Sequence, residues 1–173
     1  MGIKAFLSEI NRHGERYLTL PLYAMIVITI FMEVFRRFCL SYSSLWSEEI
    51  ARYAFIYITW IGAAAAVKER AHIRIDVILP LLSNKWKTVV FIFGDFITLI
   101  LAFIALYWSM GPVLNSIHFG SVTHGLRISQ AWFLTAVPLG FTMIVVRLLQ
   151  SMKRDFSDLK AGRPVFEGNK LFD

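Results

Sequence analysis

Residues 53–67 form an apolar run that contains no ionisable side chain except tyrosine. With the turn before it, this run reaches roughly the 20 residues needed to cross about 30 Å of hydrocarbon. Acidic residues precede it and basic residues follow, so we predict that residues 46–67 form a transmembrane helix with charged ends. Hydrophobic residues make up 57% of the chain, more than a soluble domain can hide from water, which makes the bilayer the expected solvent for most of it.

Three further apolar runs predict spans at residues 17–40, 86–110 and 129–150. Residues 1–16 have a helical apolar stripe typical of an amphipathic helix on the membrane surface, with Gly14 at its end. Residues 73–83 are too short to span and are predicted to be interfacial, and residues 151–173 form a polar tail. We expect Pro112 to lie in a linker at residues 111–128, and Pro138 with Gly140 to loosen the fourth span. The predicted fold is a single all-α membrane domain with four transmembrane helices.

The basic residues indicate the orientation of this domain. They cluster at the amino end, between the second and third spans and in the tail, which predicts that both termini are cytoplasmic. The net charge of the chain is +6. Its charged residues lie between and beyond the apolar runs and form no nucleic-acid recognition motif, so nucleic acid is not expected as a partner. Five basic residues are predicted to face anionic phospholipid head groups: Lys68, Arg70, Arg74, Lys85 and Lys87.

Small residues in the second span predict close helix packing. Gly62 and Ala66 form a small-xxx-small pair with Ala63 between them. The packing partner is either a neighbouring helix of the same chain or another subunit. The residues assigned to this subunit or helix packing are Trp46, Glu48, Glu49, Arg52, Tyr53, Trp60, Gly62, Ala63 and Ala66.

Two acidic residues within the predicted spans are candidates for function. Glu33 precedes Arg36 and Arg37 by three and four residues, which favours a structural ion pair near the membrane boundary. Asp95 lies about 12 Å inside the third span, where a carboxylate is either functional or a structural contact between helices. Arg147, near the end of the fourth span, is a possible partner for Asp95.

The sequence contains no nucleophile and base pair, no phosphate-binding loop and no cluster of metal ligands. We therefore expect neither an enzyme nor a cofactor. His72 has no second histidine or cysteine at ligand spacing, and all four histidines lie outside the predicted spans, which argues against haem ligation. Cys39 is the single cysteine, so no internal disulfide can form.

The second span and the residues after it resemble a known family, the small membrane (Q) subunits of tripartite ATP-independent periplasmic (TRAP) transporters. The strongest likeness lies in Trp46, Ser47, Glu48, Glu49 and Arg52 and in Ala66, Val67, His72, Ile73 and Asp76. Weaker likeness continues at Trp132, Pro138, Gly140 and Arg147.

This resemblance implies a companion large membrane subunit in the bacterial inner membrane. That subunit performs sodium-driven uptake of an organic acid delivered by a periplasmic substrate-binding protein, and the small subunit looks like a scaffold. Family substrates include dicarboxylates and sialic acids, between which the sequence does not select.

Two other functions remain open. The first is a self-sufficient, proton-coupled four-helix exporter, which uses Asp95 or Glu33 as its membrane acid. The second is an assembly protein unrelated to transport.

Overall fold

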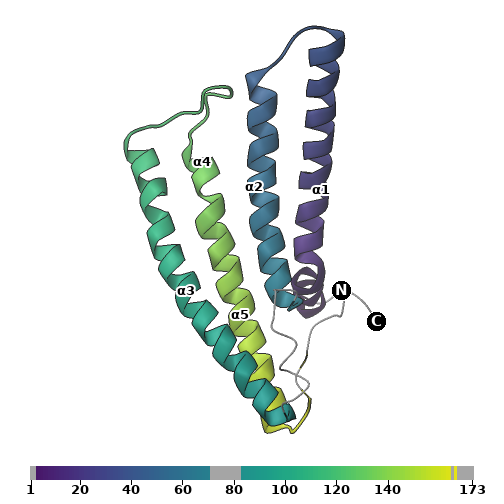
Figure 1. Ribbon diagram of the computed structural model, residues 1–173, viewed down its shortest axis with the longest axis vertical. Helices are drawn as coiled ribbons and strands as arrows, with labels where there is room; N and C mark the ends of the chain where they lie inside the picture. The colour runs from purple at the N-terminus through teal and green to yellow at the C-terminus, as the bar shows by residue number, and fades with distance from the viewer. Residues whose placement is uncertain (1–2, 71–82, 165, 167–173) are drawn as a thin grey trace. The chain divides into compact units, whose positions relative to one another are not determined.

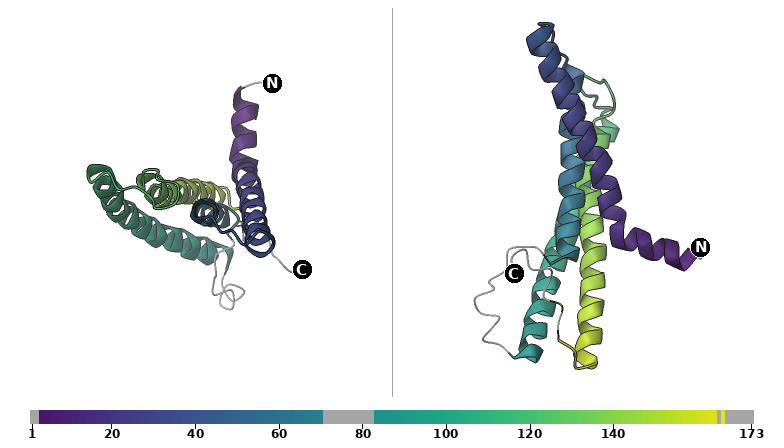
Figure 2. Two further views of the ribbon diagram at one scale, coloured as in Figure 1. Left: turned by 90° about the horizontal axis from the view of Figure 1, so that it is seen from above. Right: turned by 90° about the vertical axis from the view of Figure 1, so that its right-hand side faces the viewer.

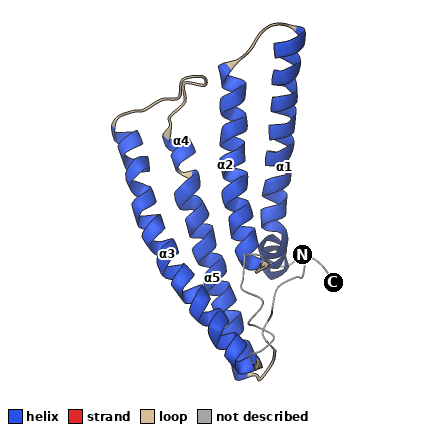
Figure 3. Ribbon diagram, viewed as in Figure 1, coloured by secondary structure: helices blue, strands red, loops and turns tan. Residues whose placement is uncertain are grey.

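The structure is a computed structural model that describes residues 3–70, 83–164 and 166. The five secondary-structure elements within these residues are all helices (Figures 1 and 3). The described residues also contain one isolated β-bridge, between Val122 and Ser129. The helices are α1 (Ile3–Cys39), α2 (Leu45–Lys68), α3 (Asn84–His118), α4 (Ala131–Leu134) and α5 (Ala136–Lys160). The predicted all-α fold class is confirmed.

Four helical segments are long and apolar enough to cross a membrane: Gly14–Cys39, Leu45–Lys68, Trp86–His118 and Ala131–Lys160. Large apolar side chains on them stay exposed, as Phe31 on α1 and Leu101 and Phe103 on α3 illustrate. Contiguous apolar surface of this kind is unfavourable in water and favourable against lipid or another apolar helix. The chain is therefore a multi-pass membrane protein.

The first helix continues through Gly14, so the prediction that the amino-terminal helix ends there is wrong. A glycine inside a helix costs about 1 kcal/mol relative to alanine, but it keeps its backbone donor and acceptor, and the hydrogen bonding runs on. Figure 2 shows that the first turns of α1 bend away from the rest of that helix. A surface location for residues 1–16 remains a prediction.

Helices α3 and α5 are both longer than predicted. Helix α3 passes through Pro112 to His118, so residues 111–118 are helical rather than part of a linker. Proline removes one backbone donor, and a membrane helix tolerates this loss where local adjustments satisfy the freed carbonyl. Helix α5 extends ten residues past the predicted end at residue 150. The interruption expected near Pro138 lies at Thr135, between α4 and α5, one turn before the proline.

The chain divides into two compact units, and each contains polar contacts of its own. The first unit consists of Met1–Gly62 and Met110–Val137, and the second of Ala63–Ser109 and Pro138–Asp173. The predicted interfacial segment at residues 73–83, which includes Arg74, lies outside the described residues except for Ser83. His72, directly before this segment, also lies outside them.

Candidate functional site

In the first unit, Glu33 of α1 binds the amino end of α2. Its carboxylate accepts hydrogen bonds from the Ser44 backbone N at 3.0 Å, Ser44 Oγ at 2.8 Å and Ser43 Oγ at 2.9 Å. Ser44 directly precedes α2, where unpaired backbone N–H groups favour a negative charge. Glu33 is therefore a structural group that joins two helices.

Arg36 contributes to the same junction, but through a different partner from the one predicted. Its Nη1 donates to Ser44 Oγ at 3.4 Å, and its guanidinium lies 5.5 Å from the ring centroids of both Tyr42 and Trp46. Among the described residues Glu33 forms no ion pair with Arg36 or Arg37, so the predicted pair along α1 is wrong. The carboxylate binds serine donors instead, because they lie at the positive end of α2.

The loop between α3 and α4 is attached to α2 by Glu49. The Glu49 carboxylate accepts hydrogen bonds from the backbone N of Gly125 at 2.8 Å and of Leu126 at 2.9 Å. A β-carbon at position 125 would lie 3.0 Å from backbone atoms of Leu45 and Trp46, so only glycine fits here without movement. Sequence analysis missed Gly125, because its role depends on a contact with a segment some 80 residues earlier in the chain.

The same face of α2 also holds α4. Residues 49, 53 and 57 recur at intervals of one helical turn. The Tyr53 ring packs against Phe133 at a centroid distance of 5.0 Å, and the Tyr57 hydroxyl donates to the Trp132 carbonyl at 2.6 Å. Within this chain Glu49 and Tyr53 thus pack helices and loops, the first of the two alternatives that the sequence left open.

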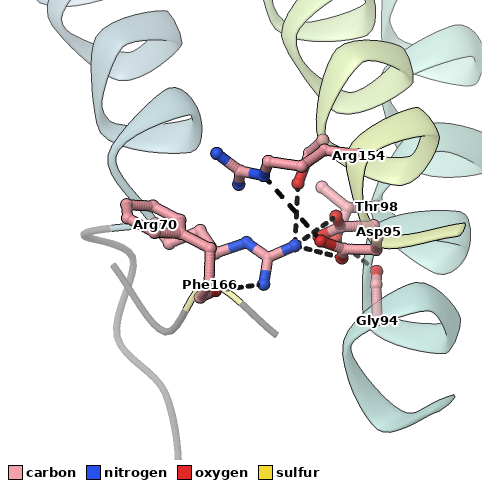
Figure 4. Close-up of polar contacts among 8 residues, drawn as sticks. Arg70, Gly94, Asp95, Thr98, Arg154 and Phe166 are labelled. Atoms are coloured by element: carbon pink, nitrogen blue, oxygen red, sulfur yellow. Dashed lines mark hydrogen bonds and ion pairs between the residues drawn. The ribbon is translucent and has the colours of Figure 1, made fainter. Parts of the chain in front are cut away.

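In the second unit, Arg70 lies in a buried cluster of charged residues (Figure 4). It follows the end of α2 with a φ of 53°, a left-handed conformation that is unfavourable for a residue with a side chain. Its Nη2 forms an ion pair with Asp155, donates to Ser151 Oγ at 3.0 Å and lies 3.9 Å from Asp95 Oδ2. The side chains of Arg70 and Asp155 are 1% and 0% exposed, and that of Asp95 is 17% exposed.

Two aromatic residues complete this charge cluster. The Arg70 guanidinium lies 4.8 Å from the Phe91 ring centroid, and its Nη1 donates to the Phe166 carbonyl at 2.6 Å. Arg154 stacks on the Phe166 ring at 4.3 Å, and its Nε lies 3.9 Å from Asp155 Oδ1. The charge cluster thus joins the end of α2, α3, α5 and the residue Phe166 beyond α5.

The structure corrects two predictions about this charge cluster. Arg70 does not face lipid head groups, because carboxylate, hydroxyl and carbonyl acceptors of its own chain surround its guanidinium. The ion pair of Asp95 is with Arg70 rather than with Arg147. Arg147 lies eight residues before Asp155 on α5, about 12 Å along the helix, and donates to Gln150 at 2.7 Å.

Asp155 is the most important residue that sequence analysis missed, because residues 151–173 were assigned to a polar tail. A signal was present in the spacing of the residues before it. Ile144, Leu148, Ser151 and Asp155 follow one another at intervals of three or four, and all four are buried. The buried face of α5 therefore continues into residues that are polar by composition.

The remaining predicted site residues are distributed along α2 and α3. Trp46, Glu48 and Arg52 are exposed, and Trp60, Lys68 and Lys87 are half-buried. Gly62, Ala63 and Ala66 are also half-buried, whereas Ala64 is 0% exposed. The side chains of Arg74 and Lys85 lie outside the described residues.

Substitutions in the small-residue segment should separate folding from association. We expect Ala64→Leu to lower the free energy of unfolding by about 1–3 kcal/mol, because a larger side chain overpacks a buried position. Ala66→Leu, on a different face of α2, should leave unfolding nearly unchanged and weaken association with a partner subunit by about 1 kcal/mol. Thermal unfolding in detergent and co-purification yield measure the two effects. Equal effects of the two variants on both measurements would contradict this assignment.

Comparison with known proteins decides the family. Residues 26–158 match the family described as the DctQ component of tripartite ATP-independent periplasmic transporters. The chain belongs to this family. The resemblance found in the sequence is confirmed, and the family is a component of transporters rather than a family of enzymes.

Individual relatives agree with this membership. The chain is similar to the sialic acid TRAP transporter small permease protein SiaQ of Vibrio cholerae, with 28% identity over 155 residues, 84% of this chain and 83% of that protein. It is 28% identical over 110 residues, 64% of its length, to the isethionate TRAP transporter permease protein DctMQ of Oleidesulfovibrio alaskensis. It is 25% identical over 120 residues, 69% of its length, to the sialic acid TRAP transporter permease protein SiaT of Haemophilus influenzae.

The last two relatives are much longer than this chain, which spans only 17% of DctMQ and 19% of SiaT. The chain therefore corresponds to one part of each of these longer permease proteins.

Proposed function

We propose that this chain is the scaffold subunit of a sodium-driven TRAP transporter that takes up an organic acid of the dicarboxylate or sialic acid type. Family membership and the similarity to SiaQ along most of both chains support a small permease subunit. In this proposal the large subunit carries substrate and sodium, and a periplasmic binding protein delivers the substrate. The complex lies in the bacterial inner membrane.

The observation that carries the scaffold role is that the two candidate coupling acids are engaged in structural contacts. Glu33 accepts three hydrogen bonds from Ser43 and Ser44, and Asp95 lies beside the buried Arg70. A coupling acid must change its protonation during each cycle, and contacts that hold helices together oppose such a change. These contacts favour the scaffold over the self-sufficient exporter.

Asp95→Asn tests this role directly. Asparagine keeps hydrogen-bonding capacity beside Arg70, so we expect uptake to fall only as far as the yield of intact complex falls, within about twofold after normalisation. The measurement is uptake of a labelled organic acid by vesicles that contain both subunits and the binding protein. Asp158→Asn, which alters a pair with Arg163 near the end of α5, is the matched control. Normalised uptake near zero for Asp95→Asn alone would refute the scaffold role.

Affinity purification of the tagged chain in mild detergent tests the partner. We expect a much larger polytopic membrane protein to co-purify, because the exposed apolar helices offer a wide surface to a second membrane subunit. Recovery of a homodimer alone would favour the exporter instead.

Reporter fusions test the proposed orientation. The bias of basic residues predicts cytoplasmic signals for fusions at Ser83 and Gly162, and periplasmic signals for fusions at Ser43 and Gly120. A periplasmic signal at Gly162 would reverse the assignment.

A further inference from the structure

Helices α3 and α5 continue beyond the level at which α2 ends. Arg70, two residues after α2, contacts both Asp95 and Asp155, so these two residues mark that level on α3 and α5. Helix α3 has eleven residues, 84–94, before Asp95, about 16 Å along its axis. Figures 1 and 2 show the start of α3 beside the end of α5. We name residues 84–94 and 150–160 the α3–α5 extension; its α5 part begins five residues before the level of Asp155.

One side of the α3–α5 extension is apolar. Trp86 and Phe93 are 63% and 64% exposed, and Val89 and Val90 between them are also exposed. These positions share one face of α3, which lies about 180° from the direction of Asp95. The same face continues as exposed isoleucines at positions 97, 100 and 104, so no polar residue separates it from the membrane-spanning surface.

The face of α5 opposite Asp155 is polar and basic, and the exposed Phe156 and Leu159 lie beside it. Gln150, Lys153, Ser157 and Lys160 are exposed and recur at intervals of three or four on α5. This face points away from the direction of Asp155. The charge cluster lies between the two helices, so the apolar face of α3 and the basic face of α5 lie on opposite sides of the pair.

The charges nearby are predominantly positive. Residues 84–95 and 150–163 contain six basic and three acidic residues. Asp95 and Asp155 belong to the charge cluster, and Asp158 lies 3.7 Å from Arg163. Lys153 and Lys160 therefore present positive charge that no carboxylate of the described residues balances.

We propose that the α3–α5 extension is a binding surface for anionic phospholipid and lies in the membrane interface. The apolar face of α3 contacts the acyl chains, and Lys153 and Lys160 of α5 contact the phosphates. Exposure of the apolar face to water is unfavourable, and burial of the charged lysines in hydrocarbon is also unfavourable. The membrane interface is the environment that avoids both costs. Trp86 at the end of the apolar face has the side chain most typical of this depth. The proposal rests on the membrane placement of the chain and is independent of the scaffold role.

Tryptophan quenching by brominated lipid tests this location. In one variant Trp86 is the single tryptophan, and the other four are phenylalanine. The matched control replaces Trp86 by phenylalanine as well and carries Ser157→Trp on the basic face. Both are reconstituted in vesicles of phosphatidylglycerol and brominated phosphatidylcholine, alone and together with the large subunit. We expect bromines near the head group to quench Trp86 by more than half, and Ser157→Trp to respond mainly to aqueous iodide.

The outcomes separate lipid from protein as the occupant. Equal quenching of the two tryptophans, or none for Trp86, overturns the proposal. Quenching of Trp86 in the chain alone that disappears when the large subunit is present also overturns it, because a protein then covers this face. Failure of the large subunit to bind at all contradicts the scaffold role and leaves the quenching result valid.

A comparison of anionic with neutral lipid tests the proposed contact of Lys153 and Lys160 with phosphates. Phosphatidylglycerol should raise the Tm of the wild-type chain above its value in neutral lipid. The Lys153→Gln/Lys160→Gln variant should show less than half of that increase, whereas Lys153→Arg/Lys160→Arg should keep it. An identical increase in all three proteins overturns the proposed contact with phosphates.

Discussion

Arg70→Met is expected to destabilise the chain by about 3–5 kcal/mol, enough to remove most folded protein from a detergent extract. The substitution removes the closest cation of the fully buried Asp155, so that only Arg154 Nε at 3.9 Å remains, and it removes the donor to Ser151 and Phe166. A buried carboxylate with so little compensation costs far more than the lost contact itself contributes. Fluorescence-detected size exclusion after a temperature series measures the loss.

Two further variants make this expectation specific. Lys153→Met removes an exposed positive charge two residues before Asp155 and should leave the melting temperature nearly unchanged. Arg70→Met combined with Asp155→Leu should recover much of the stability, because an apolar pair of similar volume avoids the cost of desolvating two charges. If Arg70→Met melts like the wild-type chain, the charge cluster has no structural role.

Glu49→Ala is expected to release the loop between α3 and α4 from α2. The carboxylate accepts two charge-assisted hydrogen bonds from consecutive backbone amides, at Gly125 and Leu126, and alanine removes both acceptors. We expect amide hydrogen exchange at residues 125 and 126 to accelerate on the order of tenfold or more, since local opening of the loop then requires no broken charged contact. Exchange measured by mass spectrometry on loop peptides tests this effect.

The neighbouring residue provides the control for this loop. Glu48 has the same charge and is exposed, so Glu48→Ala should leave exchange in the loop within about twofold of the wild-type rate. Glu49→Gln retains one acceptor oxygen and should give an intermediate rate. Equal exchange in all four proteins would show that other contacts, such as the bridge between Val122 and Ser129, hold the loop in place.

The sequence by itself determined the class of fold and the family. Apolar runs of about 20 residues in a membrane are expected to form transmembrane helices, because a helix pairs its backbone polar groups within the same segment. These properties depend on local periodicity and composition, which a single sequence displays directly. The residues of the second span that carry the family resemblance are likewise close together in the chain.

The helix ends were harder to predict, for a physical reason. Pro112 and the polar residues after Gln150 signal an end to a helix by local propensity, yet α3 and α5 both continue. Tertiary packing overrides propensity when one face of a helix remains buried, as Ser151 and Asp155 show on α5.

Only the tertiary structure decided the partners of the charged residues. Arg70 is separated from Asp95 by 25 residues and from Asp155 by 85, and no periodic pattern relates them. Sequence spacing therefore favoured partners within one helix for Glu33 and an arginine in the adjacent span for Asp95. A buried charge selects its partner by proximity in space, since the cost of desolvation must be offset by direct contact, and that proximity exists only once α2, α3 and α5 have packed together.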